Sequence, residues 1–404
     1  MISGTAGRNR KTVYLDNAAS TPVDDAVIVE MIPYLKEQYG NPSSIHRFGR
    51  DTGRALQLAR RRVADLIGAR PREIIFTSGG TEADNLAIKG AALQARKQDP
   101  ERRCIITSSI EHDAILEPCK ALESSGFDIV YLPVTADGLV RPSDLKDTIS
   151  KKAGRVALVS IMYANNEVGS IQPVAELASI AHAAGALFHT DAVQAAGKIP
   201  VDVNNAQVDL MSISSHKING PKGTGALYIR HGVMLHPLIH GGGQEFLVRS
   251  GTENVHGIVG FGKACELARE KIGLYGAVRE LRDYMVSKVL GGIAHCRLNG
   301  PDDQAKRLPT NAHFTFYGVN GEDMIIKLDE YGFAVSTGSA CSVKKQKPSH
   351  VLKAMGFSYE EITGSLRITL GLQNTREEID SLVQALSEIV GELRSLSPFK
   401  EKYD

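Results

Sequence analysis

A lysine ends the segment Ser212–Lys217, S-I-S-S-H-K, which follows an apolar, strand-like run. A lysine that is partly desolvated beside cationic groups has a lowered pKa and can form an imine. Ser214 and His216 could bind a phosphate group beside it. Most lysines are simply solvated surface residues, so Lys217 needs support from the rest of the chain.

Two further polar clusters follow strand-like runs and suit a phosphorylated cofactor. Asp191 and Gln194 stand in T-D-A-V-Q, where a carboxylate could keep a ring nitrogen protonated and an amide could reach the same ring. Gly80 and Thr81 stand in S-G-G-T, between a strand and a helix. There the backbone can approach a phosphate closely, and the helix start offers free N–H groups. Taken singly, each cluster could be an ordinary turn or helix cap.

Three more residues could act on a planar cofactor or its substrate. His112, in I-E-H-D, could stack on a ring and move protons near neutral pH, or be a hydrogen-bonded structural histidine. Asn166 follows another strand and could orient a ring oxygen or a substrate carboxylate. Arg367 alternates with the apolar residues of S-L-R-I-T-L, so it points away from their core and could clamp a carboxylate in a cleft.

Cys341 lies in a segment, Ser336–Ser349, of small residues, lysines and a proline. This composition predicts an exposed, mobile loop, and the nearby cations favour the nucleophilic thiolate. The four remaining cysteines have apolar or mixed surroundings and read as buried thiols. Five cysteines without C-x-x-C pairs argue against a disulfide framework or a zinc site, so we expect no metal.

These residues need a sheet to position them, and the chain alternates Val- and Ile-rich runs with segments of helical period. This alternation predicts an α/β fold with a mainly parallel sheet between helices. The expected strands are 73–77, 104–107, 129–132, 156–162, 186–189, 208–212 and 226–230, and the expected helices include 81–97 and 174–184.

The pattern changes after His240-Gly241-Gly242-Gly243. A long helical region over about 258–289 leads to isolated strands at 313–317 and 365–370 and to helices at 323–329 and 376–394. We therefore expect a large α/β domain over 16–262 and a smaller α+β domain, which carries Cys341, over 263–404. Residues 12–15 could join either unit; we assign 1–15 to the smaller one.

Composition narrows the class of protein. The chain has 404 residues, 42% hydrophobic and 23% charged, with a net charge of +1. This length predicts two domains, and the charge balance gives no sign of a nucleic-acid or membrane-surface binder. No apolar stretch approaches the roughly 20 residues that a membrane span needs. The basic N-terminus lacks an apolar targeting region, so a cytoplasmic location is the expectation.

In their order along the chain, these motifs resemble the NifS/IscS-like cysteine desulfurases, class-V aminotransferases among the fold-type I pyridoxal 5′-phosphate (PLP) enzymes. The resemblance covers nearly the whole chain. It is carried by Y-L-D-N-A-A-S-T-P at Tyr14, G-N-P-S-S-I-H at Gly40, F-T-S-G-G-T-E-A-D-N at Phe76, N-N-E-V-G at Asn165, H-T-D-A-V-Q at His189, S-S-H-K-I-N-G-P-K-G at Ser214, R-S-G-T-E-N at Arg249 and G-S-A-C at Gly338.

The resemblance implies a role for each site residue. Lys217 would hold PLP as a Schiff base and move protons on the substrate. The implied cofactor contacts are Asp191 to the ring nitrogen, Gln194 to the phenolic oxygen, His112 stacked on the ring, and Gly80, Thr81, Ser214 and His216 at the phosphate. Asn166, beside the cofactor, and Arg367 would hold the substrate carboxylate. Thr252 would reach the phosphate of a neighbouring subunit, which implies a homodimer with shared sites.

The implied reaction converts L-cysteine to L-alanine and leaves the sulfur on Cys341 as a persulfide, for transfer to an acceptor such as an iron–sulfur scaffold protein. Lys344, Lys345 and Lys347 depart from the usual small and hydroxyl residues after this cysteine; we hypothesise that they lower its pKa or dock an acidic partner.

Several related functions would leave a similar sequence. A selenocysteine lyase or a desulfurase for tRNA or DNA thiolation would share the core residues. An ordinary aminotransferase would share the fold, but the G-S-A-C segment argues against it. A non-catalytic scaffold on the same fold would have no need to keep Lys217, Asp191, His112 and Cys341 together.

Overall fold

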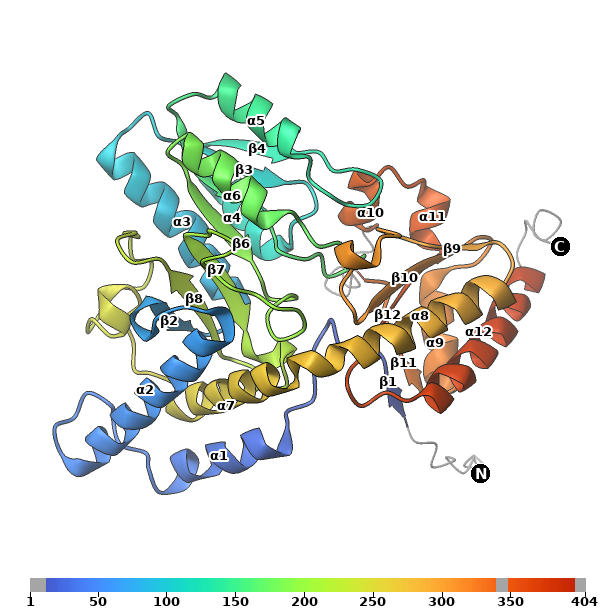
Figure 1. Cartoon of the computed structure of the whole chain (residues 1–404), viewed down its shortest axis with the longest axis horizontal. Helices are drawn as coiled ribbons and strands as arrows, with labels where there is room; N and C mark the ends of the chain where they lie inside the picture. The colour runs from blue at the N-terminus through green and yellow to red at the C-terminus, as the bar shows by residue number, and fades with distance from the viewer. Residues whose placement is uncertain (1–11, 339–347, 397–404) are drawn as a thin grey trace, which may run out of the picture.

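The computed structural model describes residues 12–338 and 348–396. Within these ranges the elements form a large sheet with its helices and a second, smaller group of strands and helices beside it (Figure 1). Cys341, Lys344, Lys345 and Lys347 lie outside the described residues.

The large sheet has seven strands in the order β2-β8-β7-β6-β5-β3-β4. Only β8 runs antiparallel to its two neighbours, which confirms the predicted mainly parallel seven-stranded sheet. The strands are β2 (Ile74–Thr77), β3 (Cys104–Ser108), β4 (Asp128–Leu132), β5 (Val156–Ser160), β6 (Leu187–Asp191), β7 (Leu210–Ser214) and β8 (Gly225–Ile229).

Three strand ends differ from the sequence prediction by two residues. β6 and β7 continue to Asp191 and Ser214, because Asp191 still pairs with β7 and Ser214 with β8. β5 stops at Ser160, where its pairing with β6 ends. The chemically important residues therefore belong to the last positions of the strands, where backbone pairing holds them.

Both faces of this sheet are covered by helices. Successive residues of β2 alternate between two cores: Ile74 and Phe76 pack on one side and Ile75 on the other. The first core takes α2 (Arg47–Ile67), α5 (Pro142–Lys151), α6 (Val174–Ala183) and α7 (Val255–Lys271), and the second takes α3 (Gly80–Gln98) and α4 (Asp113–Glu123). Helix α1 (Asp25–Lys36) packs against α7.

The second group has its own core. Its strands form the antiparallel order β12-β10-β9 and the parallel pair β1-β11. Leu366 and Ile368 of β12 lie in this core, and Arg367 contacts residues outside it. The elements are β1 (Val13–Tyr14), α8 (Tyr275–Gly292), β9 (Cys296–Leu298), β10 (Asn311–Phe316), α9 (Gly321–Glu330), β11 (Phe333–Ala334), α10 (His350–Ala354), α11 (Tyr359–Thr363), β12 (Ser365–Thr369) and α12 (Arg376–Leu396).

The connection between the two groups runs along α7, the 3-10 turn η4 (Ile272–Leu274) and α8 (Figure 1). Ala264, Cys265 and Ala268 of α7 belong to the first core. We propose that the large unit extends to about residue 271 rather than 262, and that β1, paired with β11, belongs to the smaller unit. No helix in the described part of the chain is long and apolar enough to span a membrane.

Candidate active site

Lys217 lies just beyond the carboxyl end of β7, an inner strand of the large sheet. It ends the 3-10 turn η2 (Ser215–Lys217), which follows β7 directly. Its Nζ donates to the carbonyl oxygens of Ala18 at 2.5 Å and Ala19 at 2.8 Å, in the segment between β1 and α1. The amine is thus held in a half-buried polar pocket, unlike an ordinary surface lysine.

Asp191 and His112 lie in the same pocket as Lys217. Burial raises the pKa of Asp191, and the positive charges of His112 and Lys217 oppose that rise. Burial lowers the pKa of His112, which Asp191 opposes and Lys217 reinforces. His112 caps α4 and accepts the N–H of Ala114 at Nδ1 (3.1 Å), so a neutral ring carries its proton on Nε2. The structure therefore brings together three residues that the sequence predicted as a site.

A buried serine hydroxyl and a glycine lie close together at the start of α3. The hydroxyl of Ser214 is buried and has no hydrogen-bond partner among the described residues. A Cβ added at Gly80 would come within 2.9 Å of Val193 Cγ2 and 3.6 Å of Ser214 Cβ, so a glycine keeps this corner open. Thr81 is exposed in the first turn of α3. An unused donor beside free helix N–H groups is an arrangement that suits an anion.

His216 lies in the turn η2, two residues after Ser214. Its Nδ1 is 3.2 Å from the Ser20 hydroxyl. Burial, followed by the charges of Lys217, Lys222 and Lys198, lowers the pKa of His216 to about 4. The surrounding cations that disfavour a charged imidazole would equally favour a bound phosphate.

Gln194 and a lysine that the sequence analysis missed continue the pocket. Gln194 Nε2 donates to Ala18 O at 2.9 Å, the same oxygen that Lys217 uses. Lys198 is 4% exposed and donates from Nζ to Gln194 Oε1 at 2.9 Å. Its spacing of four residues from Gln194 is a weak signal, because lysines four residues from a polar side chain are common on surfaces.

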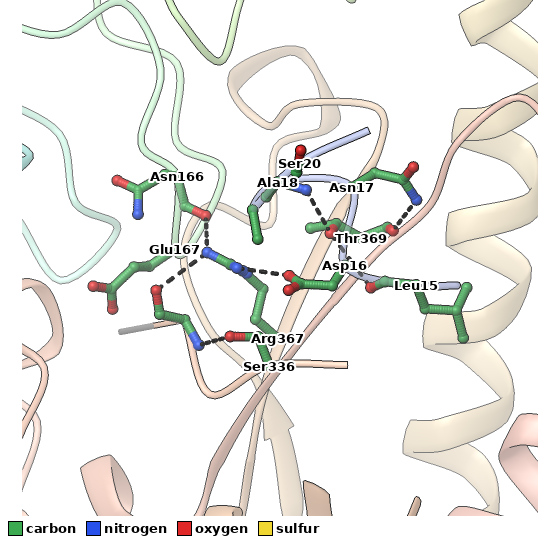
Figure 2. A network of polar contacts seen from close by, with 12 residues as sticks. Leu15, Asp16, Asn17, Ala18, Ser20, Asn166, Glu167, Ser336, Arg367 and Thr369 are labelled. Atoms are coloured by element: carbon green, nitrogen blue, oxygen red, sulfur yellow. Dashed lines mark hydrogen bonds and ion pairs between the residues drawn. The ribbon is translucent and has the colours of Figure 1, made fainter. Parts of the chain in front are cut away.

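Arg367 links the smaller unit to the pocket, as Figure 2 shows. Its Nη1 donates to the carbonyl oxygens of Asn166 at 2.9 Å and Gly338 at 3.2 Å, and its Nη2 pairs with Asp16 Oδ1 at 2.8 Å. The guanidinium is 2% exposed, and its buried Nε has no acceptor among the described residues. The structure thus joins Arg367 to Asn166 through the main chain. Asp16, which sequence reasoning did not select, is its carboxylate partner.

The last two predicted residues are placed differently. Thr252 is exposed in the loop before α7. Cys341 lies outside the described residues. The four described cysteines are free thiols. Burial raises the pKa of Cys104 to about 11 and that of Cys119 to about 12, and it also raises those of Cys265 and Cys296. None of these four is therefore suited to act as a thiolate.

A buried polar layer lies behind Asp191. His189 contacts the hydroxyls of Ser160 at 2.9 Å and Ser212 at 3.0 Å, and burial lowers its pKa to about 3. Asp84, 3.7 Å from His189 Nε2, has a pKa raised by burial and by the charge of Asp191. Among the described residues, no group of three or more His, Cys, Asp or Glu side chains is arranged to hold a metal ion.

Comparison with known proteins assigns this chain to a family. The family model for class-V aminotransferases matches residues 13–382. A protein of Dictyoglomus turgidum called "Cysteine desulfurase IscS" is 51% identical over 98% of this chain and 98% of its own. A solved NifS-like protein is 40% identical, with a TM-score of 0.87, over 94% of this chain and 100% of its own. A solved SspA in complex with cysteine is 37% identical, with a TM-score of 0.77, over 88% and 98%.

Proposed function

Because the chain belongs to the class-V aminotransferase family, we propose that it is a PLP-dependent cysteine desulfurase that converts L-cysteine to L-alanine and passes the sulfur to Cys341. The observation that carries the proposal is the pocket itself. A half-buried lysine, a buried aspartate and a serine hydroxyl without a partner among the described residues lie at the carboxyl ends of parallel strands, where α/β sheets bind ligands.

The residues present fit PLP. The unused Ser214 hydroxyl and the open corner at Gly80, with Thr81 and His216 beside them, would hold the phosphate. Asp191 would pair with the protonated ring nitrogen. This positive partner would stabilise the carboxylate and so offset the effect of burial, which raises the pKa of Asp191. Gln194 would contact the ring's phenolic oxygen, and His112 would stack on the ring.

When bound, PLP supplies an electron sink for the carbons of the substrate. Lys217 Nζ would carry the cofactor and then hold and return protons, and the Ala18 and Ala19 carbonyl oxygens would orient it. Arg367 would bind the substrate carboxylate through the donors that Asp16 does not use, with Asn166 beside it.

Cys341 would complete the reaction. Its thiolate attacks the substrate sulfur, so a sulfur–sulfur bond forms as the carbon–sulfur bond breaks. The electron pair of the broken bond stays on carbon, which takes up a proton to give alanine. The raised pKa values of Cys104 and Cys119 support this choice of nucleophile. The sulfur would then pass to an acceptor such as an iron–sulfur scaffold protein, and Lys344, Lys345 and Lys347 would either lower the pKa of Cys341 or bind an acidic partner.

The test is mass spectrometry of the PLP-loaded protein after incubation with L-cysteine. Wild type should gain about 32 Da, the mass of one sulfur atom, on Cys341, and alanine should form. Cys341→Ala should gain none there, with Cys104→Ala as a matched control that keeps the modification. A wild-type protein that forms alanine without sulfur on Cys341 would refute the assignment, and faster turnover of selenocysteine than cysteine would favour a selenocysteine lyase.

We further propose a homodimer in which Thr252 reaches the partner's phosphate site. Large apolar side chains are exposed on and near α1 and in the loop before Thr252: Val29, Leu35, Tyr39, Ile45, Phe48, Phe246 and Leu247. Such clusters favour a second protein surface. Light scattering should give twice the chain mass, and Leu247→Asp should lower it, whereas Ile326→Asp on α9, also exposed, should not. A wild-type monomer would refute the dimer.

We propose a cytoplasmic location as well, supported by the four described cysteines being free thiols. Fractionation of cells that produce the protein tests this, and its recovery in a secreted or membrane fraction would contradict it.

A further inference from the structure

Lys198 is a buried cation that the proposed reaction does not use. It is 4% exposed, and no carboxylate in the described part of the chain forms an ion pair with it. Burial of an ammonium group without a carboxylate partner is unfavourable, so a lysine at this position needs a local reason. The acceptor that the structure provides is Oε1 of Gln194, at 2.9 Å.

The hydrogen-bond partners of Gln194 determine which end of its amide is the carbonyl oxygen and which is the NH2 group. Lys198 Nζ offers donors to Oε1, whereas Ala18 O can only accept and faces Nε2 at 2.9 Å. The carbonyl of the amide therefore points toward Lys198 and its NH2 group toward Ala18. Turning the amide over would place two donors together at one end and two acceptors at the other.

The NH2 end lies on the side of Lys217. Ala18 O accepts from both Gln194 Nε2 and Lys217 Nζ, so these two nitrogens share one oxygen. One amide hydrogen is used by Ala18, and the second is left for another acceptor.

We propose that Lys198 is a positioning residue: it holds the Gln194 amide with its NH2 group toward Lys217 and the cofactor, so that Gln194 donates to the cofactor's ring oxygen. The proposal rests on the proposed PLP site. Burial, with the charges of Lys217 and Arg367, lowers the pKa of Lys198 to about 7. Because both a neutral amine and an ammonium can donate to Oε1, the amide keeps its orientation on either side of that pH.

The test is a double-mutant cycle on PLP binding to apo-protein, which does not depend on turnover. Gln194→Ala should weaken PLP binding about tenfold, the loss of one net hydrogen bond. Lys198→Met should weaken it to within about twofold of the same value, because the freed amide no longer presents its NH2 group. The double variant should be no weaker than either single one. Lys263→Met, a half-buried lysine of α7 paired with Glu266, is the matched control and should bind as wild type.

The visible absorbance of the PLP–lysine Schiff base gives a second readout. A donor to the ring oxygen competes with the proton shared between that oxygen and the imine nitrogen. Its loss should raise the pH midpoint of the colour change by about one unit in Gln194→Ala and Lys198→Met alike. Lys198→Gln, which keeps an N–H donor, should return toward the wild-type midpoint.

Three results would overturn the proposal. The first is a Lys198→Met variant that binds PLP as wild type does, and the second is a double variant that binds PLP about a hundredfold more weakly than wild type, the product of two independent effects. The third is a folded Lys198→Gln variant that binds PLP no more tightly than Lys198→Met. If Lys198→Met does not fold, Lys198→Gln is compared with wild type and Gln194→Ala instead, and a folded Lys198→Gln variant that binds PLP as weakly as Gln194→Ala would overturn the proposal. Failure of the wild-type protein to form any visible chromophore with PLP would instead refute the proposed function.

Discussion

The proposed cofactor end of the site, with Asp191, Ser214 and Lys217, and its proposed substrate end, with Arg367, are built in different ways. At the cofactor end, Asp191 and Ser214 are the last residues of adjacent parallel strands, and Lys217 follows three residues later. At the substrate end, Arg367 contacts Asp16, Asn166 and Gly338, which lie far apart in the sequence (Figure 2). The first end is therefore determined by one sheet, and the second by the packing of the smaller unit onto it.

The two ends also differ in the partners that they already have. Each keeps one buried donor without a partner among the described residues, the Ser214 hydroxyl and Arg367 Nε, but only Arg367 already pairs with a carboxylate, Asp16, at 2.8 Å. A phosphate would add a missing partner. A substrate carboxylate would have to share the guanidinium with Asp16, and the unpartnered Nε is a donor it could use. We infer that the cofactor end supplies affinity and the substrate end supplies discrimination among carboxylates.

The largest expected effect comes from replacing Arg367, which should lower the turnover of cysteine far more than it lowers PLP binding. Arg367→Leu should lower kcat/KM for cysteine about 10²–10³-fold, since removal of one partner of a buried, hydrogen-bonded charge pair costs roughly 2–5 kcal/mol. Much of this loss should appear in KM. The affinity of apo-protein for PLP, measured by absorbance titration, should change less than about threefold, because Arg367 belongs to the substrate end.

Arg367→Lys is the matched control for this prediction. It keeps the positive charge opposite Asp16 but loses the planar fork, so its kcat/KM should fall between wild type and Arg367→Leu. A loss of PLP affinity as large as the loss of kcat/KM would contradict the separation of the two ends.

The difference between the ends also explains what the sequence could predict. Asp191, Ser214 and Lys217 come at or just after strand-like runs, where parallel sheets bind ligands. For Lys217 this was not enough, and the order of the motifs along the chain, which carries the family resemblance, distinguished it from a surface lysine. The pairing of Asp16 with Arg367 was not predictable, because no local pattern connects residues 351 positions apart. Lys198 was missed for a related reason: tertiary packing, and not local composition, buries it. The proposed extension of the large unit past residue 262 rests on Ala264, Cys265 and Ala268, which belong to the first core, because helical periodicity alone does not assign a residue to a unit.

A smaller effect, on stability, is expected from Glu111 behind the cofactor end. Its side chain is fully buried and accepts from the Ser108 hydroxyl at 2.5 Å and from Met162 N at 3.0 and 3.1 Å. Burial raises the pKa of Glu111 to about 8 from an ordinary value of 4.5. Between these pH values the folded protein holds a proton that the unfolded chain has lost. This group therefore makes the free energy of unfolding fall as pH rises from about 4.5 to about 8.

Glu111→Gln should remove that contribution. The thermal midpoints of wild type and variant should lie closest near pH ~5. Toward pH ~8 the midpoint of wild type should fall increasingly below that of the variant. The corresponding difference in the free energy of unfolding should be a few kcal/mol at most. Glu117→Gln on the exposed face of α4 changes one charge without this burial and should give a pH-independent offset. Parallel pH profiles for wild type and Glu111→Gln would show that Glu111 is already ionised in the folded protein. Glu111 would then carry a buried negative charge that interacts unfavourably with the charge of Asp191.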